Sequence, residues 1–173
     1  MNTIVLSYSL TGNNKALAGS IAGALGADHV SITEPKDRTN GTIVADLLLG
    51  RTPRVTPAAE AIEGRDMVIF VGPVWMGNVA TPFRTFFKRL RQNPGRYAYV
   101  SISGGALGPN SNLARELTKR LGSAPAALID MHIADLLPIP KPTMKDTGDY
   151  RLTDGDKAKL TDRAVVELTA AMQ

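Results

Sequence analysis

The sequence predicts an α/β protein: a single open, doubly wound domain over residues 1–173, with a five-stranded parallel sheet and helices on both faces. Short apolar runs alternate with amphipathic stretches along the chain, which is the pattern of successive βαβ units. The run 66–71 (DMVIFV) is nearly all apolar, as expected for a central parallel strand that is covered on both faces. A chain of 173 residues can bury a sizeable core in one domain.

The first half of the chain supplies three strands and two helices in this scheme. Leu17, Ile21 and Leu25 recur every four residues and form one apolar stripe, which indicates a helix that ends at Gly26. The region 33–64 is rich in Pro, Thr and Gly, and its role is open. The predicted elements, in order, are a strand at 3–8, a helix at 14–25, a strand at 29–32, a short helix near 43–49 and a strand at 66–71.

The second half continues the alternation. A helix at 81–91 tolerates Pro82 because proline fits the first helical turn. Thr153 and Asp156 have the spacing of a helix-capping pair. The predicted elements are that helix, a strand at 97–102, a helix at 112–121 that ends at Gly122, a strand at 126–133, a proline-rich surface segment at 138–150 and a helix at 153–172.

Composition excludes several classes of site. The chain has no cysteine, so disulfides, CxxC redox chemistry and iron–sulfur ligation are ruled out, and a redox role needs an organic cofactor. His29 and His132 lie far apart without metal-ligand spacing, so we expect no metal site. The first residues lack the features of a secretory signal, and no stretch approaches the length of a membrane span. The expectation is a cytoplasmic protein.

The net charge of +4 is mild, and no nucleic-acid-binding motif accompanies it, so we expect no nucleic-acid partner. The densest basic stretch contains Arg84, Lys88, Arg89, Arg91 and Arg96. We interpret it as the solvated face and C-terminal end of a helix, where cations suit the helix dipole. The alternative is a docking patch for an acidic partner.

Three loops follow predicted strands on the edge where doubly wound sheets bind ligands. The first, 9–14 (SLTGNN), joins a strand to a helix and offers hydroxyls, amides and a flexible glycine to an anion at a helix N-terminus. The chain contains neither GxxxxGK[ST] nor GxGxxG, so the loop suits a monophosphate held by neutral donors. An ordinary capped turn is the alternative. The candidate binding residues here are Ser9, Thr11, Gly12, Asn13 and Asn14.

This loop is similar to the phosphate loop of the flavodoxin family, with Asn14 where that family usually has Thr or Ser. The second loop, 72–78 (GPVWMGN), resembles the segment of short-chain flavodoxins that lies along one face of the isoalloxazine ring. The resemblance implies that Trp75 or Met76 supplies an apolar face and that a peptide beside Gly77 turns its carbonyl toward flavin N5. A tryptophan that is merely part of the core is the alternative. The implied cofactor-binding residues are Pro73, Val74, Trp75, Met76, Gly77 and Asn78.

The third loop, 103–108 (SGGALG), resembles the Ser/Thr-Gly-Gly loop that reaches the pyrimidine side of the flavin. Its implied binding residues are Ser103, Gly104 and Gly105; a flexible loop without ligand is the alternative. Many flavodoxins place an aromatic residue here, whereas this chain has Ala106 and Leu107, so the second flavin face is expected to be open. The tripeptide 146–148 (DTG) matches aspartic proteases, but those enzymes need two such sites in a β-rich fold, and we interpret it as coincidence.

The sequence therefore predicts a flavodoxin-like protein with FMN as cofactor. We expect an electron-transfer protein. The alternative is an FMN-dependent NAD(P)H:quinone-type oxidoreductase that acts on a small acceptor. A third hypothesis is an interaction module that binds no flavin. The basic balance favours the oxidoreductase slightly, because positive charge near the ring would raise the flavin potential. The partner is accordingly a redox protein or a small-molecule acceptor, and the oligomeric state is open.

Overall fold

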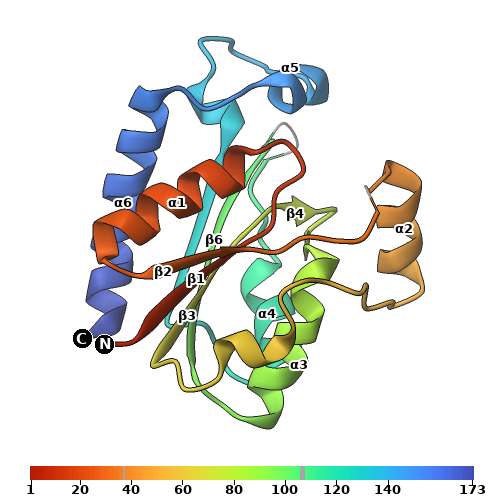
Figure 1. The fold of residues 1–173 in the computed structure, drawn as a ribbon. Helices are drawn as coiled ribbons and strands as arrows, with labels where there is room; N and C mark the ends of the chain where they lie inside the picture. Colours follow the sequence, from red (N-terminus) through yellow and green to blue (C-terminus); the bar gives the residue numbers. More distant parts are fainter. Residues whose placement is uncertain (37, 106–107) are drawn as a thin grey trace.

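A computed structural model describes residues 1–36, 38–105 and 108–173. Its centre is a five-stranded parallel sheet in the order β2-β1-β3-β6-β7, as predicted (Figure 1). The strands are β1 (Thr3–Ser7), β2 (Asp28–Ser31), β3 (Met67–Val71), β6 (Arg96–Ser103) and β7 (Ala127–His132). The order reverses beside β1, because the chain passes from β1 to one neighbour, β2, and then returns to the other, β3. Ligands of doubly wound sheets bind at the carboxyl ends of the strands near such a reversal.

Helices cover both faces of the sheet (Figure 1). The helices α1 (Asn13–Leu25) and α6 (Asp154–Met172) pack on one face with the core that includes Ile69 and Val100. The helices α3 (Arg84–Gln92) and α4 (Leu113–Leu121) pack on the other, where Phe70, Phe83 and Phe87 form an aromatic cluster. The remaining helices are α2 (Asn40–Leu48), α5 (Met144–Asp149), and the 3₁₀ turns η1 (Ala59–Ile62), η2 (Thr81–Phe83) and η3 (Ile133–Leu136). No described helix is long and apolar enough to cross a membrane.

Local sequence decides where several elements end. Gly26 and Gly122 follow α1 and α4 in the left-handed conformation, which glycine adopts without the penalty that a Cβ imposes. Thr153 and Asp156 form the predicted capping box of α6.

Two predicted loops contain regular structure instead. The segment 72–78 forms a short antiparallel hairpin of β4 (Val74–Trp75) and β5 (Asn78–Val79). The proline-rich segment 138–150 contains α5, which begins with a second capping box at Thr143 and Asp146.

Candidate functional site

The three predicted loops meet at one edge of the sheet and enclose a cleft of about 540 Å³. This volume is within the range of small-molecule sites. The cleft brings together ten of the fourteen candidate residues: Thr11, Asn14, Pro73, Val74, Trp75, Met76, Gly77, Ser103, Gly104 and Gly105. The other four, Ser9, Gly12, Asn13 and Asn78, do not line it.

The first loop is arranged around the N-terminus of α1. The Ser9 hydroxyl accepts a hydrogen bond from the Gly12 main-chain N–H at 2.9 Å, which closes the loop on itself. Gly12 has φ +91° and supplies no side-chain cap to α1. No described side chain accepts a hydrogen bond from the first amide groups of this 13-residue helix. An anion placed there would meet these groups together with the positive end of the helix dipole.

The two asparagines of the loop use their side chains differently from the prediction. Asn14 Nδ2 donates to the Ile102 carbonyl at 2.9 Å, and its Oδ1 accepts from the Ile102 N–H at 3.0 Å. Asn13 likewise donates to the Tyr150 carbonyl and accepts from the Leu152 N–H. Their side-chain amides therefore tie α1 to β6 and to the chain before α6, a role that the sequence did not predict. Their main-chain amides remain at the helix N-terminus.

The β4–β5 hairpin forms one wall of the cleft. Met76 and Gly77 occupy its turn with φ +51° and φ +76°, the pair of positive values typical of a type I′ hairpin turn. Among described residues, Met76 is the only one other than glycine with positive φ. Its side chain is 78% exposed and lines the cleft. Asn78 Nδ2 donates to the Met76 carbonyl at 3.0 Å, so Asn78 supports the turn from outside the cleft.

Trp75 is only 9% exposed, although it contributes to the cleft wall. The Tyr8 ring meets it edge to face at a centroid distance of 5.8 Å, and the Arg38 guanidinium carbon lies 5.5 Å from its ring centroid. Trp75 is therefore both a core residue and part of the site, and the exposed apolar surface of the hairpin belongs to Met76.

The region 33–64, whose role the sequence left open, supports this wall. Arg38 forms ion pairs with Glu34 at 2.5 Å and with Asp46 at 2.8 Å. The Tyr8 hydroxyl donates to Glu34 at 2.8 Å, and burial together with this carboxylate raises the pKa of Tyr8. The network connects Tyr8, which directly follows β1, and the segment before and within α2 to Trp75.

Two glycines of the third loop, Gly104 and Gly105, are required by the packing of the protein itself. A Cβ on Gly105, which has φ +76°, would lie 2.4 Å from Cβ of His132. A Cβ on Gly104 would lie 2.9 Å from the Thr147 hydroxyl of α5. The loop thus packs tightly on β7 and α5 while its other side faces the cleft. Ala106 and Leu107, on which the expectation of an open flavin face depended, lie outside the described residues.

Sequence reasoning missed the contribution of α5. Met144, which is 71% exposed, lines the cleft together with Thr147 and Gly148. The T-x-x-D spacing of Thr143 and Asp146 was the available signal for this helix, but only the tertiary structure brings it to the sheet edge. The tripeptide 146–148 is thus part of α5 and its cap.

Every described residue that lines the cleft is uncharged. The positive net charge of the chain led us to expect a cation close to the flavin ring, and the described lining contains none. A phosphate here would be held by neutral donors and the helix N-terminus, as the loop composition suggests.

The sequence matches no model of a known protein family and no curated protein. Solved structures, by contrast, share its architecture. A flavodoxin from the domain Archaea is 13% identical, with each chain covered in full and a TM-score of 0.56. The chain has a flavodoxin-like fold.

Two further structures extend this likeness. A flavoprotein from Lactobacillus acidophilus in complex with FMN is 17% identical, with 76% of this chain and 91% of that chain covered and a TM-score of 0.62. The two-electron reduced flavodoxin of Megasphaera elsdenii is 14% identical over 91% of this chain and 98% of that chain, with a TM-score of 0.51. This chain thus shares its fold with these three proteins at a sequence identity of 13% to 17%.

Proposed function

We propose that this protein binds FMN in the cleft at the sheet edge and transfers electrons through it. The observation that carries the proposal is the combination of an uncapped helix N-terminus and an uncharged, partly apolar cleft on the same edge. The first suits a phosphate monoester, and the second suits a flat heterocycle. The flavoprotein from Lactobacillus acidophilus, which shares the fold, is in complex with FMN.

Different groups of the chain would contact different parts of FMN. Thr11 and the main-chain amides of residues 13 and 14 would hold the phosphate. Met76 would contact one side of the ring, because its polarizable thioether adapts to an aromatic surface. Main-chain groups of Ser103, Gly104 and Gly105 would meet the polar edge of the ring. Bound FMN would supply the reversible uptake of electrons, which no side chain of this chain provides.

Protein groups around the ring would orient it and limit its access to water. Trp75 contacts both Tyr8 and Arg38, so it forms a firm support behind the hairpin. Met76 and Met144 are both exposed at the cleft, and their flexible side chains would shield the ring. Asn78 holds the Met76 carbonyl and thereby controls the direction of the peptide next to Gly77.

Titration of the purified apoprotein with FMN tests the binding proposal. We expect saturable quenching of flavin fluorescence, and riboflavin, which lacks the phosphate, to bind at least tenfold more weakly. Equal affinity for riboflavin and FMN would refute the phosphate assignment, and no binding of either would refute the flavin site.

A potentiometric titration of the FMN-loaded protein then tests electron transfer. Two resolved one-electron steps support a carrier. A single two-electron step with rapid turnover of NAD(P)H and a quinone supports the oxidoreductase instead.

A further inference from the structure

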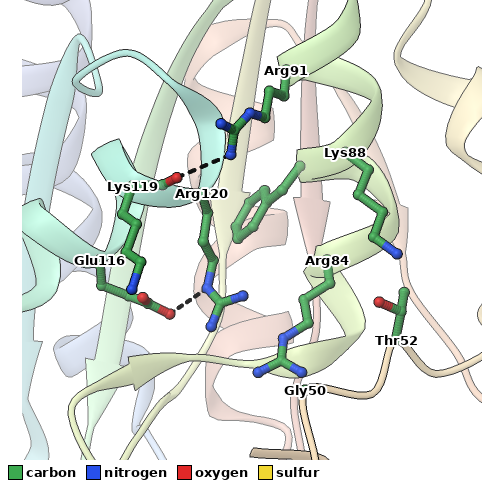
Figure 2. Close-up of a pocket in the computed structure, with 9 residues that line it drawn as sticks. Gly50, Thr52, Arg84, Lys88, Arg91, Glu116, Lys119 and Arg120 are labelled. Atoms are coloured by element: carbon green, nitrogen blue, oxygen red, sulfur yellow. Dashed lines mark hydrogen bonds and ion pairs between the residues drawn. The ribbon is translucent and has the colours of Figure 1, made fainter.

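A second cleft, of about 390 Å³, lies between α3 and α4 and shares no described lining residue with the first. Its lining contains five cationic side chains and a single carboxylate, Glu116 (Figure 2). Three cations, Arg84, Lys88 and Arg91, project from successive turns of α3, and Lys119 and Arg120 come from α4.

This arrangement corrects the interpretation of the basic stretch as a solvated helix face at Arg84, whereas Lys88 and Arg91 are exposed as predicted. Arg84 is only 4% exposed. Arg89 pairs instead with Glu63, and Arg96 donates to main-chain carbonyls at the end of α6. The basic stretch therefore does not act as one patch. Its residues on one face of α3 share the cleft with Lys119 and Arg120 of α4.

Arg84 is the buried cation of this cleft. Its Nη1 donates to the main-chain carbonyls of Asp46 at 3.0 Å and Arg51 at 2.5 Å. Its Nε is buried without a hydrogen-bond partner, and no described carboxylate forms an ion pair with it. A buried guanidinium without a counter-charge is unfavourable, so an anion in the cleft would supply what the described residues do not.

The lining around Arg84 contains more cations than carboxylates. Burial, followed by the charge of Arg120, lowers the pKa of Arg84, and the carboxylates of Glu116 and Asp46 act in the opposite direction. Glu116 pairs with Arg120, and the other cations of the lining have no carboxylate partner among the described residues. In Figure 2 the guanidinium groups of Arg84 and Arg120 extend toward the same end of the cleft.

We propose that the α3–α4 cleft binds a phosphate group of a small molecule. Guanidinium forks match the oxygens of phosphate, and ammonium groups add point charges to it. The hydroxyl of Thr52 also lines the cleft and can donate to an anion. Because the cleft is concave and small, it suits a compact anion better than the flat acidic surface of a partner protein. The phosphate is either inorganic or the terminal group of a larger metabolite, and the inference is independent of the flavin proposal.

Site-resolved NMR of the full chain tests this inference. Inorganic phosphate, pyrophosphate and ADP are titrated separately at constant ionic strength maintained with sodium chloride. We expect saturable shifts of the amide signals of Thr52, Lys88, Glu116 and Arg120. Shifts confined to residues 11–15 would instead report binding at the candidate flavin phosphate loop, so the two sites are distinguished within one experiment.

The sources of phosphate are separated by affinity. Tighter binding of ADP than of inorganic phosphate and pyrophosphate indicates a phosphorylated metabolite, and the reverse order indicates the free anion; either supports the proposal. The proposal is overturned if none of the three probes causes saturable shifts in the cleft. It is also overturned if an acidic peptide, such as hexaglutamate, binds there saturably and the three probes do not.

Matched variants test the assigned residues. Arg120→Gln and Lys88→Gln should each weaken binding of the preferred probe about tenfold. Arg115→Gln removes the same charge from an exposed position of α4 outside the cleft and should change affinity less than twofold. An equal effect of all three variants would indicate diffuse attraction and overturn the site. Unchanged thermal unfolding of each variant shows that the fold is intact.

Discussion

The guanidinium of Arg38 lies over the ring of Trp75, with its carbon 5.5 Å from the ring centroid, and it is bound to two carboxylates at the same time. Its side chain is 4% exposed, and that of Glu34 is 11% exposed. The region 33–64, which contains α2 and η1, is thus connected to the candidate flavin wall by a buried ion-pair network.

Replacement of Arg38 by methionine should lower the free energy of unfolding by about 3 kcal/mol or more, because Glu34 and Asp46 would lose their counter-charge. Urea unfolding measures this change, and the fluorescence of Trp75, the single tryptophan, reports the local effect. Arg54→Met, at an exposed position of the same region, is the control and should change stability by less than about 0.5 kcal/mol. Similar losses in the two variants would contradict the assigned network.

Substitution of Gly105 by alanine should be far more harmful than substitution of Gly108. Both have positive φ, but only at Gly105 would the added Cβ meet His132, at 2.4 Å. At Gly108 no described atom lies within 4 Å, so the cost there is backbone strain of about 1 kcal/mol. Thermal unfolding and FMN titration of both variants check the prediction. Equal losses of stability and affinity in the two variants would show that the approach of the added Cβ to His132 has no effect.

Asn14→Ala should reduce stability more than it reduces intrinsic affinity for FMN. The substitution leaves the buried N–H and carbonyl of Ile102 without their partner, at a cost of about 1–3 kcal/mol for each unpaired group. Thr11→Ala should have the opposite profile, with weaker FMN binding at nearly unchanged stability. Paired unfolding and binding measurements distinguish the two roles. A large loss of FMN affinity in an Asn14→Ala variant that keeps its stability would show that Asn14 contacts the ligand directly.

The capping box of α6 should contribute stability that depends on pH. Hydrogen bonds from Thr153 and then from Tyr150 lower the pKa of Asp156 below its usual value, which is about 3.9 in an unfolded chain. The contribution is therefore complete above about pH 4–5 and is lost as the pH falls through the lower pKa of the folded state.

Asp156→Asn should accordingly unfold more easily than the parent at neutral pH, and the difference should shrink as the pH falls below 4. Chemical unfolding between pH 2 and 7 measures it. Asp162→Asn, at an exposed position of the same helix, provides the comparison. A difference for Asp156→Asn that stays constant with pH would contradict the role of the charged form.

Much of the architecture follows from local pattern. The apolar run at 67–71 and the four-residue repeat of α1 predict their elements because a covered strand and an amphipathic helix each impose their own periodicity. Fold rules then place the loops after β1, β3 and β6 on one edge. Ten of the fourteen candidate residues line the cleft for this reason.

Long-range contacts decided the rest. Asn14 bonds with Ile102, 88 residues away, and no local pattern distinguishes that partner from a ligand. Likewise, the cations of α3 and α4 meet only because the helices pack on one sheet face. The sequence by itself determined the sheet, its helices and the edge that holds the candidate site, since these depend on periodicity and chain direction. Only the tertiary structure decided which polar groups are already satisfied and where the positive charge collects, because both depend on which distant groups share each buried volume.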